Sequence, residues 1–208
     1  VYLVTRSAPL YSALHEAQYI VAMVGAVTAL FAATIAVGQY DIKKVLAYST
    51  ISQLGFMVAA VGMGAYVAGM FHLITHAFFK ALLFLAAGAV IIAMHHEQDI
   101  RKMGGLWRYL PITWLTSLIG TLSLIGFPGF SGFFSKVAII QAVAAAHRAG
   151  ADYAWWCLMI GVFVTALYSF RMFFLVFHGA ERLDHHAKEH LHEPPLVVWL
   201  PLVLLAIP

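Results

Sequence analysis

The sequence predicts an all-α, polytopic transmembrane helix bundle with one discontinuous helix. Hydrophobic residues make up 62% of its 208 residues and charged residues only 10%, whereas soluble domains carry about 25% charged residues. Several apolar stretches approach or exceed the roughly 20 residues that a spanning helix needs. One region, 126–132, holds three glycines and a proline within seven residues and cannot continue a regular helix. We therefore expect a single transmembrane domain over residues 1–208.

The apolar stretches set the expected helices. Pro111 opens one of them, at a position where helices accept proline. The stretch after the glycine-rich region is too short for a full span, so we interpret it as broken or partly unwound. Because the chain starts without methionine and stops inside an apolar run, we also expect it to be a fragment of a longer protein. The predicted spans are 17–37, 45–61, 66–94, 111–126, 133–147 (broken), 153–177 and 196–208 (truncated).

Charge in the connectors agrees with alternating spans. Lysine and arginine gather around residues 39–44 and 97–109, whereas the connector between them, 62–65, has neither. The two basic connectors should therefore lie on one side, which the positive-inside rule places in the cytoplasm. Because the basic residues are scattered among connectors, the net charge of +3 does not indicate a nucleic-acid partner. The single cysteine, Cys157, excludes an intramolecular disulfide.

The third span carries His72, His76 and Lys80 at a spacing of four residues, which places them in one stripe on one helix face, with Thr75 beside it. A lysine at a helix centre costs roughly 2.5–3.5 kcal/mol on insertion scales, so the stripe should face the protein interior, a water chain or an acidic partner. Lysine and histidine can exchange protons, so we prefer a proton pathway. The alternative is a structural polar seam between helices.

Lys136 is a second intramembrane lysine, four residues after Gly132. Charged groups beside broken helices recur at midplane ion sites of transporters, but a lysine near a helix end can also extend to the interface. Arg171 is expected to reach the interface or to form an ion pair. Polar residues of the second span can bond to neighbouring helices, which we prefer, or line a hydrated track: Tyr48, Ser49, Thr50, Ser52 and Gln53.

The connector after the sixth span is rich in possible metal ligands, but their spacing matches no firm zinc pattern, so we expect a solvated loop and no metal. A phosphate loop, a dinucleotide fingerprint and a cysteine cluster are missing from the sequence, so we expect no cofactor in this chain. The residues concerned are His178, Asp184, His185, His186, Glu189, His190, His192 and Glu193.

Four stretches, in this order, resemble the antiporter-like membrane subunits of respiratory complex I, the proton-translocating NADH:quinone oxidoreductase. They are 41–55 (DIKKVLAYSTISQLG), 71–84 (FHLITHAFFKALLF), 96–106 (HEQDIRKMGGL) and 132–136 (GFFSK). The third stretch is particularly similar to the large, subunit L type. The resemblance extends over nearly the whole chain.

The resemblance implies proton translocation coupled to electron transfer from NADH to quinone. It assigns His72, His76 and Lys80 to a central hydrophilic axis, and makes Lys136 the lysine that exchanges protons with the far side. NADH, flavin, iron–sulfur clusters and quinone would be bound by other subunits. The partners would be other membrane subunits of complex I, especially a neighbouring antiporter-like subunit, in the bacterial cytoplasmic membrane rather than the mitochondrial inner membrane.

Two departures from the family pattern matter. Val137 stands where the family often has an acidic residue, and the glutamate and lysine of the family's other half-channel would precede Val1. Alternatives are the large subunit of a multisubunit cation/proton antiporter, a membrane-bound hydrogenase, a structural scaffold and a passive channel. The 96–106 stretch favours complex I. A scaffold predicts normal assembly and pumping after Lys80→Met or His76→Ala.

Overall fold

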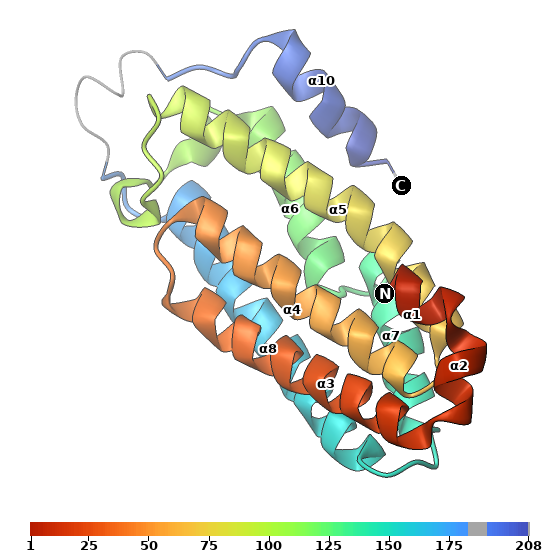
Figure 1. The fold of residues 1–208 in the computed structure, drawn as a ribbon. Coiled ribbons are helices and arrows are strands. Elements are labelled where there is room, and N and C mark those ends of the chain that lie inside the picture. Colours follow the sequence, from red (N-terminus) through yellow and green to blue (C-terminus); the bar gives the residue numbers. More distant parts are fainter. Residues whose placement is uncertain (183–190, 208) are drawn as a thin grey trace.

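A computed structural model describes residues 1–182 and 191–207. These residues form an all-α bundle (Figure 1), as the sequence predicted. A 3-10 turn lies at each of Ile100–Lys102 and Leu106–Arg108, and α8 continues into a π-helical turn, Phe174–His178. The α-helices are α1 Tyr2–Arg6, α2 Ala8–Ala13, α3 His15–Gly38, α4 Ile42–Gly62, α5 Tyr66–Ala93, α6 Pro111–Ile125, α7 Ser131–Ala144, α8 Ala151–Phe173 and α10 Leu196–Leu205.

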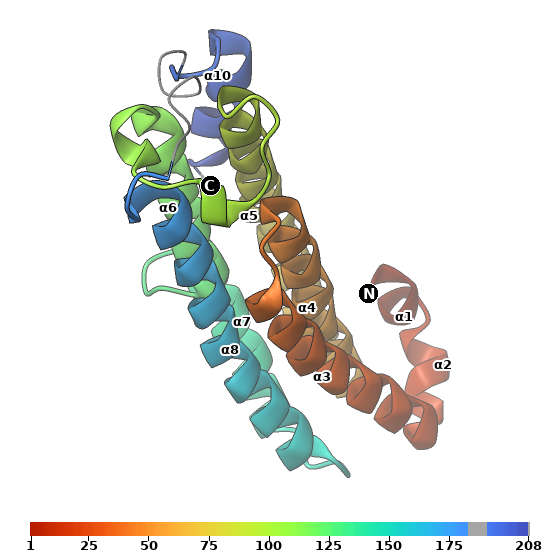
Figure 2. The ribbon, with the colours of Figure 1, turned by 90° about the vertical axis from the view of Figure 1, so that its left-hand side faces the viewer.

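Within the described residues, four helical stretches are long and apolar enough to cross a membrane: His15–Gly38, Ile42–Gly62, Tyr66–Ala93 and Ala151–His178. They contain the predicted spans 17–37, 45–61 and 153–177, and they match 66–94 to within one residue. The short helices α1 and α2 were not predicted, because their few residues give no hydropathy signal. Figure 2 shows them at one edge of the bundle, away from α6 and α8.

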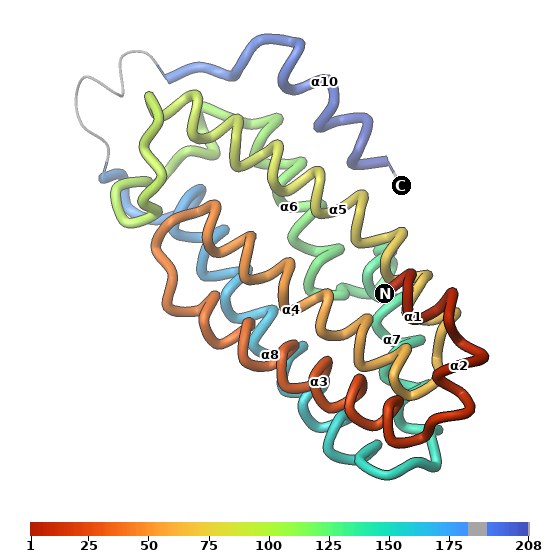
Figure 3. Tube along the Cα trace, viewed as in Figure 1, coloured from red at the N-terminus to blue at the C-terminus, as the bar shows by residue number. Residues whose placement is uncertain are grey.

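Helices α6 and α7 lie end to end and together extend along the bundle once. They are not the separate fourth and fifth spans that we predicted. In α6, Gly120 lies against Leu82 and Leu83, in the second half of α5. In α7, Ser135 bonds to His72, in the first half of α5. The two short helices therefore follow each other along α5 in the opposite direction (Figure 3). The discontinuity lies in 126–130, so α6 and α7 form the one discontinuous helix that the sequence predicted, although α7 itself is regular over Ser131–Ala144.

Alanine side chains bring α3 and α4 into close contact. A fully buried stripe of alanines follows one face of α3, which lets two helix backbones approach closely. Ser52 of α4 then reaches α3, donating to the carbonyl oxygen of Ala29 at 2.7 Å. The stripe is Ala22, Ala26, Ala29, Ala33 and Ala36.

The connectors after α3 and α5 meet at one end of the bundle. Ile42 N–H donates to Gln98 O at 3.0 Å, and Ile100 N–H donates to Tyr40 O at 2.9 Å. These bonds form an isolated β-bridge between Asp41 and Asp99. The two basic connectors therefore lie at the same end, as the charge pattern predicted.

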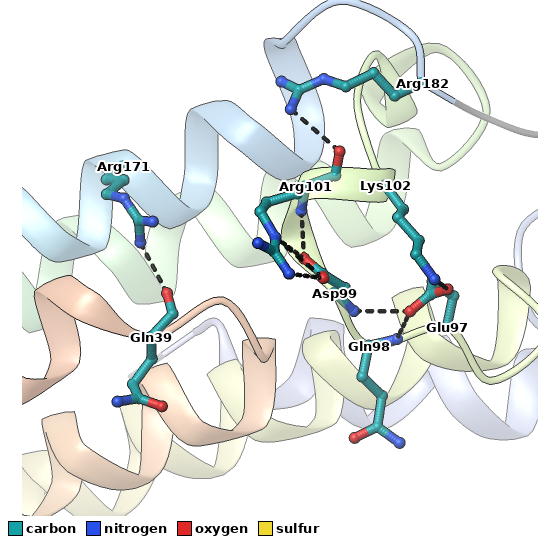
Figure 4. Close-up of polar contacts among 8 residues, drawn as sticks. All are labelled: Gln39, Glu97, Gln98, Asp99, Arg101, Lys102, Arg171 and Arg182. Atoms are coloured by element: carbon teal, nitrogen blue, oxygen red, sulfur yellow. Dashed lines mark hydrogen bonds and ion pairs between the residues drawn. The ribbon is translucent and has the colours of Figure 1, made fainter.

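Charged side chains pair with each other in the connector after α5 (Figure 4). Arg101 contacts Asp99 at 2.7 Å and Lys102 contacts Glu97 at 2.8 Å. The hydrogen bond from Arg101 lowers the pKa of Asp99 to about 2, and the bond from Lys102 lowers the pKa of Glu97. Both pairs are exposed, and such pairs contribute little to stability. Arg182 donates to the carbonyl oxygen of Arg101 at 3.1 Å, which ties the segment after α8 to the same connector.

Arg171 does not form the predicted ion pair among the described residues. Its Nη1 donates to Gln39 O at 2.9 Å, and its guanidinium lies 5.0 Å from the ring centroid of Tyr40. The guanidinium of Arg101 lies 4.2 Å from the same ring. Arg171 is partly buried in this contact, so it helps to fasten α8 to the end of α3.

Two side chains of the histidine-rich connector, His178 and Glu193, form hydrogen bonds with α6. His178 Nε2 accepts a hydrogen bond from Trp114 at 2.9 Å. Glu193 accepts from the N–H groups of Ile112 and Thr113 at 2.7 and 3.0 Å. It thereby caps α6, which has no capping side chain of its own. Asp184, His185, His186, Glu189 and His190 lie outside the described residues.

Candidate functional site

Lys80 lies at the middle of α5 and points into the bundle. Its side chain is 5% exposed. The ammonium group donates to Ser49 Oγ at 2.7 Å and to Leu46 O at 3.2 Å, both on α4. Lys80 is therefore solvated by a hydroxyl group and a backbone carbonyl instead of lipid or bulk water.

Ser49 is the meeting point of three helices. Besides the ammonium group of Lys80 from α5, its oxygen accepts a hydrogen bond from the hydroxyl group of Tyr168, on α8, at 2.7 Å. Tyr168 is 1% exposed. Because a serine oxygen has two lone pairs, it can accept both bonds at once. The polar contact thus extends from α5 through α4 to α8.

His72 is held at both ring nitrogens. Its Nδ1 lies 2.8 Å from Ser135 Oγ on α7, and its Nε2 lies 3.1 Å from Gln53 Oε1 on α4. Thr75 Oγ1 donates to the same serine at 3.0 Å. A serine can donate or accept, and a glutamine can present oxygen or NH₂. The ring is therefore supported in either tautomer, as a group that gains and loses protons requires.

His76 lies between His72 and Lys80 on the same face. Its ring centroid is 6.1 Å from that of His72 and 5.3 Å from that of Phe79. Its Nε2 atom is buried and has no hydrogen-bond partner among the described residues. Buried polar atoms are costly when unpaired, so this position favours a water molecule.

Lys136 is buried at the break between α6 and α7. Its side chain is 3% exposed, and its ammonium group donates to Leu124 O at 2.5 Å. That carbonyl belongs to the last turn of α6, where oxygens lack helical partners and carry partial negative charge. The C-terminal end of one half-helix therefore receives the ammonium group of the other. Lys136 does not extend to the interface.

Two glycines make this break. Gly126 ends α6 with φ of 80°, and Phe127 N–H bonds back to Leu122 O at 2.9 Å, a Schellman-type ending. Gly132 opens α7 directly against α6. A β-carbon there would lie 1.8 Å from the carbonyl oxygen of Ser123.

Serine hydroxyl groups line the same junction. Ser123 Oγ lies 3.0 Å from Ser131 Oγ and accepts from Gly132 N–H at 3.3 Å. Both serines also line a cavity of about 200 Å³ between α5, the break and α10. The break is therefore a polar junction beside an open space.

The two lysines lack an acidic counterpart in the described part of the chain. The ion pairs found there involve only the exposed connector after α5. Within the described α-helices the acidic residues are Glu16 and Asp152, both in first turns, and Asp41 and Glu193 lie at the N-terminal ends of α4 and α6. Uncompensated buried charges are expensive. Within the described residues, the hydrogen-bond acceptors of the two ammonium groups are hydroxyl and carbonyl oxygens, an arrangement suited to groups that take up and release protons.

The polar residues of the second predicted span divide between our two interpretations. Ser52 bonds to the neighbouring helix α3, as we preferred, whereas Thr50 donates to Leu46 O at 2.9 Å within α4 itself. Ser49 and Gln53 instead face the buried lysine and histidine. Tyr48 is partly buried against the apolar core.

Comparison with known proteins identifies the family of the chain. A sequence model of the NADH:quinone oxidoreductase/Mrp antiporter transmembrane family matches residues 1–179. The chain belongs to this family.

Relatives and solved structures of the same kind extend the match. This antiporter-family chain is 52% identical over 223 aligned residues to NADH-quinone oxidoreductase subunit L of Neisseria meningitidis, covering 100% of the chain and 33% of the relative. It thus spans about a third of that relative. A chain of the archaeal membrane-bound sulfane sulfur reductase matches with a TM-score of 0.83 and 30% identity, over 92% of this chain and 31% of that one. The Mrp complex of Dietzia sp. matches with a TM-score of 0.79 and 23% identity, over 91% and 43%, which shows the shared fold.

In this family member, the four predicted residues, His72, His76, Lys80 and Lys136, are all buried. We use the term buried layer for these four residues and the buried polar side chains of α4, α6, α7 and α8. Sequence reasoning missed several members of the layer. Ser135 directly precedes Lys136, and Thr165, Tyr168 and Ser169 recur at helical spacing in an apolar span, so a signal was present for each. The missed polar residues with buried side chains are Ser123, Ser135, Thr165, Tyr168 and Ser169.

Proposed function

We propose that this chain is part of the antiporter-like subunit of a respiratory NADH:quinone oxidoreductase and moves protons across the membrane as quinone is reduced elsewhere in the complex. The observation that carries the proposal is the burial of Lys80 and Lys136, 5% and 3% exposed, with their ammonium groups bonded to oxygen atoms of α4 and α6. Two charges about 7 Å apart interact by roughly 2–2.5 kcal/mol at an effective dielectric of 20. That is comparable to the roughly 2.3 kcal/mol for moving one charge through 100 mV.

In this mechanism, a change of charge in a neighbouring subunit alters the protonation of Lys80. Lys80 then passes a proton toward Lys136 through the polar layer that contains His72 and Ser135. Lys136 releases it at the helix break. The chain itself binds no redox cofactor: NADH, flavin, iron–sulfur clusters and quinone belong to partner subunits. The partners include a neighbouring antiporter-like subunit, in the bacterial cytoplasmic membrane.

A cation/proton antiporter is the second candidate, because the Mrp complex shares the fold. The 52% identity to subunit L supports complex I over this alternative. The two differ in their driving force. An antiporter moves protons against a sodium gradient without electron transfer, so sodium-driven proton flux in vesicles that lack NADH would favour it.

Replacing Lys80 with methionine in the full-length subunit of the assembled complex tests the proposal. We expect the proton transfer that depends on Lys80 to slow about 100-fold or more, because a positioned proton-transfer group is lost. NADH-driven proton pumping by vesicles should fall accordingly. Reduction of ferricyanide by NADH reports whether the redox subunits stay intact. Lys43→Met, at an exposed position of α4, is the matched control and should pump normally. Normal pumping by the assembled Lys80 variant would support a structural scaffold instead.

A further inference from the structure

The hydroxyl group of Tyr168, on α8, contacts the serine that also binds Lys80. It donates to Ser49 Oγ at 2.7 Å, and the same oxygen accepts from Lys80 Nζ at 2.7 Å. Gln53 lies one turn after Ser49 on the same face of α4, and Gln53 contacts His72 at 3.1 Å. Tyr168 therefore stands between the Lys80 contacts and the His72 contacts, on a helix that contributes neither lysine.

Two unpaired polar atoms lie beside this hydroxyl group. Gln53 Nε2 and Ser169 Oγ are buried and have no hydrogen-bond partner within residues 1–182 and 191–207. Both residues are 0% exposed, and Ser169 directly follows Tyr168 in α8. Buried polar atoms in native proteins are almost always satisfied, by protein or by an ordered water molecule. An amide donor, a serine and a phenol together offer the two to four partners that a buried water needs.

We propose that Tyr168 is a proton-relay residue, whose hydroxyl group passes protons between Ser49, beside Lys80, and a water molecule held by Gln53 and Ser169, beside His72. This inference rests on the proposed proton-translocating function and adds α8 to the route. The path along α5 alone would depend on His76, whereas this path runs through hydroxyl groups of α4 and α8.

The transfer balances bond by bond. The Tyr168 hydroxyl group donates to Ser49 in the structure, so it first rotates toward the water molecule, and the Ser49 hydroxyl group then donates to the Tyr168 oxygen. An N–H bond of Lys80 breaks as an O–H bond forms on Ser49, and the original serine proton moves to the Tyr168 oxygen. The original phenol proton moves to the water molecule, which gives one of its protons to His72 Nε2, in the tautomer that leaves this nitrogen unprotonated. Lys80 ends neutral and His72 ends positively charged. Serine, tyrosine and water regain their composition.

Tyr168→Phe in the full-length subunit of the assembled complex removes the hydroxyl group and keeps the ring. We expect NADH-driven proton pumping to slow about 10- to 100-fold, toward the lower part of the range for a positioned proton-transfer group. We also expect a larger solvent deuterium isotope effect on pumping, which a packing defect would not produce. Tyr109→Phe is the matched control, because Tyr109 packs against the same apolar core outside this network. It should pump at the wild-type rate.

A second variant covers the case in which Tyr168→Phe does not assemble. Ser169→Ala removes one predicted water partner with little change of volume, and we expect slower pumping with normal assembly. Wild-type pumping by Ser169→Ala, or by assembled Tyr168→Phe, would overturn the relay. If Lys80→Met pumps poorly in the same assay while these variants pump normally, the relay through Tyr168 is rejected and the proposed function stands. Wild-type pumping by Lys80→Met as well would mean that the proposed function itself fails.

Discussion

Lys136→Met in the full-length subunit is expected to stop proton release at the helix break. Methionine keeps most of the side-chain length but cannot carry a proton, and the loss of a positioned proton-transfer group slows transfer about 100-fold or more. The Leu124 carbonyl loses its ammonium partner, at a cost of about 1–3 kcal/mol for an unpaired buried group, while the cost of burying a charge disappears. The measurement is the number of protons pumped per NADH oxidised in sealed vesicles, with assembly checked on native gels.

Lys136→Arg separates charge from proton exchange. Arginine keeps the positive charge beside the carboxyl end of α6 but does not release its proton in proteins. We expect this variant to assemble and yet to pump as poorly as the methionine variant. Full pumping stoichiometry in either variant would reject the role of Lys136 as a proton-releasing group.

Gly132→Ala is expected to have the largest effect on stability. A β-carbon at this position would lie 1.8 Å from the carbonyl oxygen of Ser123, a distance that no side-chain rotation can relieve. Overpacking of this kind costs about 1–3 kcal/mol or more. Because α7 would have to move away from α6, the contact between Lys136 and Leu124 should also weaken. The expected result is a lower thermal unfolding midpoint of the subunit in detergent, together with reduced pumping.

Gly88→Ala is the matched control for this substitution. Gly88 also lies in a helix, in the second half of α5, but a β-carbon there meets nothing within 4 Å. Alanine at such a helical position is expected to be neutral or slightly stabilising. If the two alanine variants were equally stable, the tight junction between α6 and α7 would not be a feature of the protein in the membrane.

Hydropathy was enough to locate α3, α4, α5 and α8, because each is an apolar stretch of at least about 20 residues. Hydropathy could not show that α6 and α7 lie end to end and extend along the bundle together. Two short apolar segments separated by glycine and proline look the same in sequence whether they cross the bilayer separately or in series. The distinction lies in tertiary contacts, namely those of Gly120 and Ser135 with opposite halves of α5.

The site was predictable to the extent that it is local. His72, His76 and Lys80 share one helix face, so their spacing alone brings them together. Tyr168 and Ser135 join the layer only through contacts across helices, 119 residues from Ser49 and 63 residues from His72 in the chain. Polar residues are common in apolar spans as structural seams. Only the structure distinguishes Ser49, which contacts Lys80, from Ser52, which contacts α3.

A cryo-electron microscopy map of the assembled complex in lipid, at a resolution that shows ordered water, would test most directly whether the two lysines share a hydrated interior. We predict density for Lys80 at Ser49 and for Lys136 at the end of α6, with water molecules linking the layer between them. The proposed hydrated interior would be contradicted if both lysine side chains extended to headgroups or bulk solvent, with only apolar packing between them.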